Sequence, residues 1–308
     1  MLLDCCMAGD SIIAVGERGV ILLSTDGGRR WRQAREVPVS VTLTAVQFPD
    51  ARTGWATGHS GVVLRSSDGG DTWERVVDGQ GLARVALAGI RAASGASGAL
   101  LRAANAWVNE PPAKPLFDLH VFSPTRVVVV GAFGFAFETR DAGRTWSSWM
   151  QRVPNPNLLD LYAVHAVGET LYMAGDQGFV CACPDDGGSA EELKSPYAGS
   201  WFAIAGDHTT GPVLAGLQGN AWRYATDTRG WHSLTDSSSH ASFVSATQDA
   251  TGSLLLADQA NQLFELKPGA NALEVRGVVR AAPLTHAMTL RGGGILATTY
   301  RGAVLVAV

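Results

Sequence analysis

Short loops that combine aspartate, glycine and tryptophan are the first places in this sequence where chemistry could occur. Three copies read STDGGRRW at 24–31, SSDGGDTW at 66–73 and TRDAGRTW at 139–146. A carboxylate, free backbone N–H groups and an indole ring held together could bind a ligand or a metal ion. Repetition favours a structural role instead, because aspartate and glycine stabilise tight turns and tryptophan packs between repeats. We therefore expect the following residues to hold the fold: Asp26, Trp31, Asp68, Trp73, Asp141 and Trp146.

A second recurring loop places two small residues around two variable ones. Its copies start at residues 16, 58, 131, 175, 216, 257 and 299, so successive starts are 42, 73, 44, 41, 41 and 42 residues apart. Five copies have glycine at both ends, whereas Ala257–Ala260 and Thr299–Gly302 are degraded copies. Seven units of about 42 residues match the size of four-stranded propeller blades.

Apolar runs and turns alternate within each unit as four antiparallel strands require. The second unit reads LTAVQF, GWATG, GVVLRSS and TWERVV, with the turns PDART, HS and DGGD between them. The paired-glycine loop then lies between the second and third strands, where glycine adopts a positive φ at little cost. The aspartate loop lies between the third and fourth strands. The sequence predicts an all-β fold in which residues 1–308 form a single domain, a seven-bladed β-propeller of four-stranded antiparallel blades.

The one long interval contains a segment of different composition, residues 78–115, which is rich in alanine and leucine. Apolar residues recur there at helical spacing, first at Leu82, Ala86 and Ile90 and then around Leu101 and Trp107. A helical hairpin at about residues 80–110 is therefore predicted between blades 2 and 3. Two interpretations stay open: a lid or docking arm with Leu101 and Trp107 as anchors, or helices that merely pack across the blades.

Composition and motif spacing argue against several classes of protein. A net charge of −4 is not that of a strongly basic nucleic-acid-binding protein, and no run of 18 apolar residues predicts a transmembrane segment. The cysteines stand as Cys5-Cys6 and Cys181-Ala182-Cys183, without zinc-site spacing, and we expect buried free thiols. No phosphate loop or GxSxG nucleophile elbow is present. We expect neither a metal nor a cofactor.

The variable residues of the paired-glycine loops are the candidate binding residues. Turns between the second and third strands of a propeller gather on one face, around the mouth of the central channel. The variable residues mix charged, amide and aromatic groups, as a protein or peptide site does. The predicted partner-binding residues are Glu17, Arg18, His59, Phe133, Asp176, Gln177, Gln218, Gln259, Tyr300 and Arg301.

The aspartate loops also carry a family resemblance. SSDGGDTW fits the Asp-box or BNR pattern S-x-D-x-G-x-T-W in full, and the other copies depart from it only at Arg30 and Thr139. With the paired-glycine loops and their spacing, the chain resembles the photosystem II stability/assembly factor-like β-propellers, in particular their non-photosynthetic bacterial branch. The resemblance implies a non-catalytic scaffold or assembly factor located outside the cytoplasm, as in the periplasm. We expect a monomer that binds a protein partner such as a membrane complex or exporter.

Two other functions are compatible with the Asp-box motif. Sialidase-like glycoside hydrolases share the Asp box and use a tyrosine nucleophile, for which Tyr300, Arg18 and Arg301 would supply part of a site. The chain lacks the Arg-Ile-Pro phrase that such enzymes place before their first box, and it has no glutamate near Tyr300. A carbohydrate-binding propeller would expose equivalent tryptophans, whereas the tryptophans that repeat here are expected to be buried.

The repeat pattern leaves the last blade one strand short. The final unit supplies THAMTL, GILATTY and AVLVAV, and the first unit begins directly with an inner strand, LLDCCMAG. We expect a strand upstream of Met1 in a longer natural chain to complete blade 7, and a signal peptide there would support export. Without that strand, blade 7 would expose a free edge.

Overall fold

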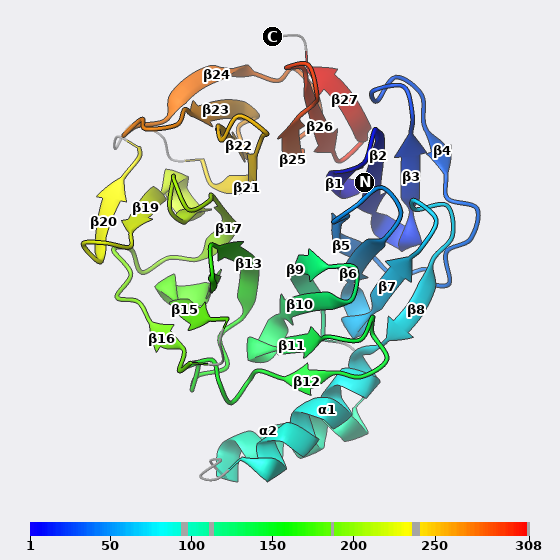
Figure 1. Cartoon of the computed structure of the whole chain (residues 1–308), viewed down its shortest axis with the longest axis vertical. Helices are drawn as coiled ribbons and strands as arrows, with labels where there is room; N and C mark the ends of the chain where they lie inside the picture. The colour runs from blue at the N-terminus through cyan, green and yellow to red at the C-terminus, as the bar shows by residue number, and fades with distance from the viewer. Residues whose placement is uncertain (94–97, 111–113, 186–187, 236–240, 307–308) are drawn as a thin grey trace.

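Seven antiparallel sheets form a closed ring in this protein (Figure 1). The computed structural model describes residues 1–93, 98–110, 114–185, 188–235 and 241–306. In each sheet the strands follow one another in chain order, and the first strand of each blade contacts the first strand of the next, ending with β25 beside β1. The seven-bladed propeller predicted from the repeat spacing is confirmed.

The first four blades lie before residue 195 and contain four strands each. Blade 1 consists of β1 (Leu2–Ala8), β2 (Ser11–Gly16), β3 (Ile21–Ser24) and β4 (Arg32–Gln33). Blade 2 consists of β5 (Leu43–Gln47), β6 (Gly54–Gly58), β7 (Val63–Ser66) and β8 (Glu74–Val77). Blade 3 consists of β9 (Leu116–Ser123), β10 (Arg126–Gly131), β11 (Ala136–Thr139) and β12 (Ser147–Ser148). Blade 4 consists of β13 (Leu161–Val167), β14 (Thr170–Gly175), β15 (Val180–Pro184) and β16 (Glu191–Glu192).

The last three blades complete the ring. Blade 5 consists of β17 (Trp201–Ala205), β18 (Val213–Gly216), β19 (Ala221–Ala225) and β20 (Gly230–Ser233). Blade 6 consists of β21 (Phe243–Gln248), β22 (Leu254–Asp258), β23 (Gln262–Leu266) and β24 (Glu274–Val278). Blade 7 consists of β25 (Leu284–Thr289), β26 (Ile295–Thr299) and β27 (Gly302–Val306). Within the described residues blade 7 therefore has three strands, as its sequence predicted.

The hydrophobic core is divided among the interfaces between neighbouring blades. Strand β10 shows why, because its side chains alternate between two faces that are both covered. Val127 and Val129 pack with blade 2, whereas Val128 and Val130 pack with blade 4, and all four are completely buried. Continuous aliphatic runs such as this one are therefore required by burial on both faces of the strand.

Blade 7 joins blade 1 through side chains. The Thr285 hydroxyl donates a hydrogen bond to the carbonyl oxygen of Leu2 over 2.8 Å, and His286 Nε2 lies 3.2 Å from Asp4 Oδ1. Among the described residues no strand pairs with the free side of β27, where Leu305 is 41% exposed. A strand from a longer chain at this edge stays a prediction.

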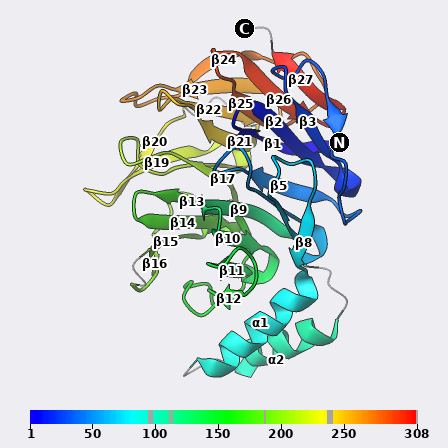
Figure 2. The same cartoon turned by 45° about the vertical axis from the view of Figure 1, so that its right-hand side comes forward.

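The insertion between blades 2 and 3 is a hairpin of α1 (Gly79–Ala92) and α2 (Gly98–Asn109), as predicted. Asp78 caps α1 by accepting a hydrogen bond from the Gly81 N–H over 3.0 Å. The apolar face of α1 is buried against blades 2 and 3, with Leu82 and Ile90 completely covered. Figures 1 and 2 show both helices at the outer edge of the ring, beside β8 and β12. The helices are packed on the blades there, and a role of the hairpin as a lid or docking arm stays a prediction.

Trp107 attaches α2 to blade 3 and should carry much of the stability of the hairpin. Its side chain is 6% exposed, and its ring lies 5.2 Å from the ring of Phe135 in an edge-to-face contact. We expect Trp107→Ala to lower the free energy of unfolding by about 3 kcal/mol, through lost burial and the cavity left behind. Urea unfolding checks this, and Asn109→Ala at the exposed end of α2 is the control. A loss below about 1 kcal/mol would contradict the packing role of Trp107.

Candidate binding face and channel mouth

The paired-glycine turns hold the same position in all seven blades. In each turn, the N–H of the residue after the first small residue donates to a carbonyl oxygen just before the inner strand of the same blade. Examples are Glu17 N to Met1 O at 3.1 Å, His59 N to Thr42 O at 2.8 Å, Asp176 N to Asp160 O at 3.0 Å and Tyr300 N to Pro283 O at 3.2 Å. All seven turns therefore lie on one face, over the starts of the inner strands. We call this surface the glycine-turn face.

The two glycines of a turn are required for different reasons. A Cβ on Gly175 would lie 1.8 Å from the carbonyl oxygen of Asp160, so the first glycine is fixed by close approach of two backbones. Gly178, the second glycine, has a φ of +75°. The residue before it, Gln177, also has a positive φ, 54°, although it is not glycine. The prediction that both glycines serve positive φ is thus wrong for the first one.

The degraded copy in blade 6 begins one residue later than its sequence pattern indicated. Gln259 donates its N–H to Ser242 O over 2.9 Å, as the first variable residue does in other blades. Asp258 therefore occupies the first glycine position, and Asn261, with a φ of 65°, occupies the second. Asparagine adopts a positive φ more readily than most residues. A search for small residues alone therefore misses this position.

Most of the predicted partner-binding residues are exposed on the glycine-turn face. Asp176 is half-buried, and its Oδ1 accepts a hydrogen bond from the Ser200 hydroxyl over 2.8 Å. Phe133 is 47% exposed, and its ring lies 5.6 Å from Lys114 Nζ and 6.5 Å from the Trp107 ring. The exposed members are Glu17, Arg18, His59, Phe133, Gln177, Gln218, Gln259, Tyr300 and Arg301. Their role in binding a partner stays a prediction.

The two predicted insertion anchors differ in their surroundings. Trp107 is buried against blade 3, so its anchoring is internal to this chain. Leu101 is half-buried and packs against the same apolar cluster. Both side chains are therefore less accessible to a partner than the sequence suggested.

The aspartate loops lie on the opposite face, between the third and fourth strands. Their position is fixed by contacts with the loops between first and second strands, such as Gly69 N to Arg52 O at 2.8 Å. Asp141 accepts hydrogen bonds from the Thr145 hydroxyl at 2.6 Å and the Thr145 N–H at 2.9 Å, which lower the pKa of its carboxyl. These carboxylate oxygens are used within the turn, as a structural role predicts.

The tryptophans of the aspartate loops pack between blades to different depths. Trp73 is 5% exposed between blades 1 and 2, and its indole N–H donates to Gly70 O over 2.9 Å. Trp31 and Trp146 are half-buried, the former against blade 7 and the latter at the interface of blades 2 and 3. The structure therefore agrees with the structural role predicted for the three rings.

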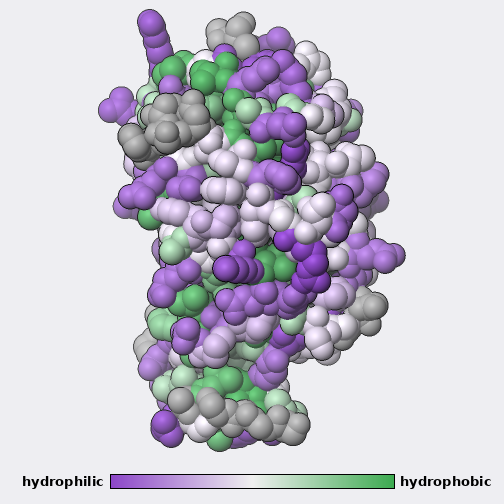
Figure 3. Space-filling model, turned by 90° about the vertical axis from the view of Figure 1, so that its left-hand side faces the viewer, coloured by the Kyte–Doolittle hydropathy of each residue, from purple (hydrophilic) through white to green (hydrophobic). Residues whose placement is uncertain are grey.

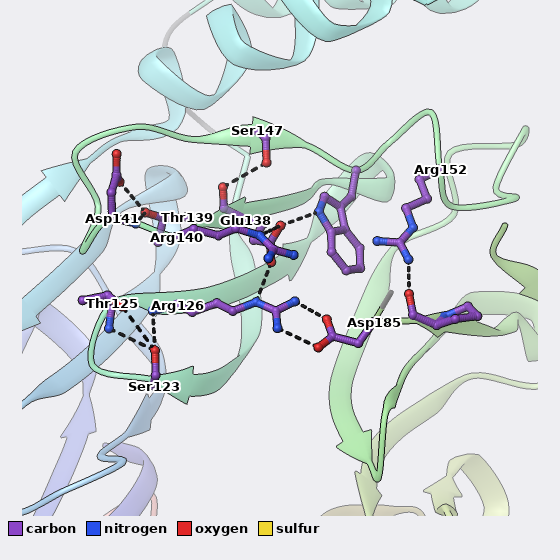
Figure 4. Close-up of polar contacts among 12 residues, drawn as sticks. Ser123, Thr125, Arg126, Glu138, Thr139, Arg140, Asp141, Ser147, Arg152 and Asp185 are labelled. Carbon is purple, nitrogen blue, oxygen red and sulfur yellow. Dashed lines mark hydrogen bonds and ion pairs between the residues drawn. The ribbon is translucent and has the colours of Figure 1, made fainter. Parts of the chain in front are cut away.

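A polar cluster between blades 3 and 4 joins their outer parts (Figure 4). Arg126 donates from Nε to Glu138 Oε1 over 2.8 Å and forms a two-point ion pair with Asp185. Glu138 is 5% exposed and also accepts from Arg140 Nε at 3.0 Å and from the Trp149 indole at 3.2 Å. Two arginines and an indole N–H thus compensate the desolvation of this buried carboxylate.

The central channel is lined by a ring of residues that the sequence analysis did not identify. In every inner strand the register with the second strand skips one residue, for instance Tyr162 between Leu161 and Ala163. Such a bulge turns the skipped side chain out of the sheet. The seven skipped residues all line one cavity of about 440 Å³: Leu3, Thr44, Phe117, Tyr162, Phe202, Val244 and Thr285. We call this ring the channel collar.

Carboxyl groups lie next to the collar at equivalent positions of blades 1 and 3. Asp4 Oδ2 accepts the Val46 N–H at 2.7 Å, and Asp118 Oδ2 accepts the Val164 N–H at 2.8 Å, so each links its blade to the next. Burial raises the pKa of both carboxyls, and that of Asp118 reaches about 7, with a further contribution from the negative charge of Asp4. The channel therefore holds acidic groups in an environment that disfavours their charge.

Asp118 gives the fold a specific dependence on pH. Its pKa lies near 3.8 in the unfolded chain and about 7 in the folded one, so its stabilising contribution is full below the lower value and is lost as pH rises through the higher one. We expect Asp118→Asn to gain stability relative to wild type between about pH 5 and pH 8, by roughly 1 to 2 kcal/mol. Urea unfolding of both proteins at both pH values measures the difference in their free energies of unfolding. His120 and His165 also titrate, but both are present in the two proteins, so their effects cancel in this difference. A pH-independent difference would contradict the assignment.

The described residues contain no cluster of three histidine, cysteine or acidic side chains that could hold a metal ion. Cys5, Cys181 and Cys183 are buried free thiols, and Cys6 is a half-buried one. In the part of the chain that the structure describes, no helix has the length and apolar character needed to span a membrane.

Comparison with known proteins supports the family resemblance. Residues 4–90 match the family model described as photosynthesis system II assembly factor YCF48. Among curated proteins, no sequence matches the chain significantly. The resemblance drawn from the repeated loops is thus confirmed in the first two blades and most of α1.

Solved structures show the same fold at low sequence identity. YCF48 from Cyanidioschyzon merolae has a TM-score of 0.67 at 14% identity, over 96% of this chain and 92% of that one. A structure described as YCF48 bound to D1 peptide has a TM-score of 0.70 at 14% identity, over 99% and 92% of the two chains. The WD40 β-propeller domain of Doa1 reaches 0.67 at 11% identity, over 99% and 91%. Identities this low establish the fold alone.

Proposed function

We propose that this propeller is a non-catalytic assembly factor or scaffold that binds a protein partner. The premise is the match of residues 4–90 to the family model of the photosystem II assembly factor. The observation that carries the proposal is the glycine-turn face. Seven turns are held rigidly by backbone hydrogen bonds, while nearly all the variable side chains predicted to bind are exposed. A rigid frame with exposed, chemically mixed side chains suits recognition of a protein surface or peptide.

The related structure of YCF48 with a D1 peptide supports a peptide or protein as the bound species, since that propeller has the same fold. We propose a segment of a membrane complex or exporter as the partner here. The family resemblance supports a location outside the cytoplasm, in the periplasm for a bacterium with two membranes. We also propose that the protein acts as a monomer. Figure 3 shows one side of the molecule as mainly hydrophilic with separate apolar areas, so that side offers little apolar surface for association.

The glycosidase alternative is disfavoured by the environment of Tyr300. A tyrosine nucleophile needs a carboxylate that accepts its proton. Tyr300 is 57% exposed at the turn between β26 and β27, and no described carboxylate hydrogen-bonds to its hydroxyl. A carbohydrate-binding role lacks support as well, because Trp31, Trp73 and Trp146 are occupied in packing between blades.

Charge reversal on each face of the propeller tests the proposal. Purified protein serves as bait for envelope extracts of the source organism, and the recovered partner is quantified by mass spectrometry. We expect Arg18→Glu with Arg301→Glu on the glycine-turn face to reduce recovery at least about tenfold, as loss of central interface charges does. The matched control carries Arg29→Glu and Arg144→Glu, which change the same charge on the opposite face. Equal recovery with both variants, or loss only with the control, would contradict the proposal.

A further inference from the structure

The channel collar has an aromatic wall on one side. Phe117, Tyr162 and Phe202 come from the inner strands of blades 3, 4 and 5, at equivalent bulge positions. The ring centroids of Phe117 and Tyr162 lie 5.0 Å apart, and those of Tyr162 and Phe202 lie 5.4 Å apart. All three side chains are half-buried and line the cavity. Half-buried aromatic rings that line a cavity can contact a bound group.

Carboxyl groups lie in and around the same cavity. Asp4 and Asp118 line the same cavity, and Asp118 has no cationic partner among the described residues. Asp160 and Asp176 lie near Tyr162, and after burial their charges are the main reason that its pKa is raised to about 12. Within the described chain, no lysine or arginine lines the cavity.

Two histidines are the basic groups of the lining, and neither supplies a counter-charge to Asp118. His286 lies against Asp4, with 3.2 Å between Nε2 and Oδ1. His165 Nε2 lies 2.9 Å from Gly206 O, and burial lowers the pKa of its ring, so it is neutral near pH 7. Asp118 therefore has no cationic partner in the cavity, and a bound cation would favour its ionised form.

We propose that the channel collar binds an alkylammonium group, with the cation against the aromatic wall and Asp118 as its counter-charge. Aromatic faces attract organic cations, and a nearby carboxylate strengthens the attraction in a partly desolvated site. An anion would meet the carboxyl groups of Asp4 and Asp118, and a purely apolar ligand would leave Asp118 without a charge partner. The cavity of about 440 Å³ has room for a small amine or a lysine side chain. The inference goes beyond the proposed function and holds whether or not a protein partner binds at the glycine-turn face.

Isothermal titration calorimetry with n-butylammonium tests the inference, and butan-1-ol serves as the neutral ligand of similar size. We expect the ammonium to bind and the alcohol to bind at least about tenfold more weakly. Tyr162→Leu and Asp118→Asn should each weaken ammonium binding at least about fivefold. Asp50→Asn is the matched control, because Asp50 also accepts two backbone N–H groups but lies in the loop between β5 and β6. If Tyr162→Leu fails to fold, Phe202→Leu replaces it.

A second ligand separates the two sources of an ammonium group. A short peptide with one central lysine is compared with the same peptide carrying norleucine. Tighter binding of the lysine peptide than of n-butylammonium supports a lysine of a protein partner, and weaker binding supports a free amine. Both results support the site. The inference is overturned if neither ammonium ligand binds, if the alcohol binds as well as the ammonium, or if binding is unchanged in both channel variants.

Discussion

Replacing Gly175 by alanine is expected to lower the free energy of unfolding by at least about 3 kcal/mol. The added Cβ would lie 1.8 Å from the carbonyl oxygen of Asp160. The position of a Cβ is fixed by its own backbone, so only a shift of one of the two backbones could relieve the clash. Relief of the clash would break the hydrogen bond from Asp176 N to Asp160 O and shift the glycine-turn face of blade 4. Urea unfolding measures the loss of stability.

Gly294→Ala is the control for this substitution. Gly294 is exposed, its φ is not in the left-handed region, and the nearest atom to an added Cβ is Leu290 Cδ1 at 3.9 Å. We expect its effect to stay within about 0.5 kcal/mol. Equal effects of the two substitutions would show that close backbone approach does not fix the first glycine.

Arg126→Met is expected to lower the free energy of unfolding by about 3 kcal/mol. The substitution removes two charge-assisted contacts at once, the one to Glu138 and the one to Asp185 (Figure 4). Glu138 would remain buried with less compensation, and the outer parts of blades 3 and 4 would lose their shared ion pair. Chemical unfolding provides the measurement.

Arg140→Met serves as the matched comparison, because Arg140 contacts the same carboxylate of Glu138. Its side chain is 60% exposed, whereas that of Arg126 is 16% exposed. A solvated ion pair contributes little, so we expect a loss below about 1 kcal/mol. If both variants lost the same free energy, burial of the Arg126 contacts would not explain their contribution.

The fold could be predicted from sequence because each blade repeats the same local requirements. The first glycine recurs in five of the seven turns, as at Gly16 and Gly175, where it permits close approach of two backbones. The aspartate loop recurs where the third strand turns into the fourth in blades 1 to 3. The pattern failed where a different residue meets the same requirement, as Asn261 does in blade 6. Helical periodicity found the insertion, but it could not show that the hairpin packs at the outer edge of the ring.

The candidate site was only partly predictable for a related reason. Turn residues such as Gln177 could be assigned to one face from strand order alone. The channel collar depends on a bulge, and a bulge changes the direction of one side chain without an obvious sequence signal. A weak signal exists in phrases such as LTAV at 43–46 and LYAV at 161–164, whose second residue joins the collar. Asp118 directly follows the collar residue Phe117 in the chain. Its pKa is raised by burial, which the sequence alone does not reveal.

Site-specific photo-crosslinking tests the central claim most directly, since it records which face of the propeller meets the partner. A photoreactive amino acid is introduced at Gln177 or Gln218 on the glycine-turn face, and at Arg29 or Arg144 on the opposite face. Each protein is irradiated in intact cells of the source organism, and the adducts are identified by mass spectrometry. We predict that Gln177 and Gln218 both crosslink to the same protein and that Arg29 and Arg144 do not. Crosslinking of that protein from the opposite face alone, or no protein adduct from either face, would contradict the account.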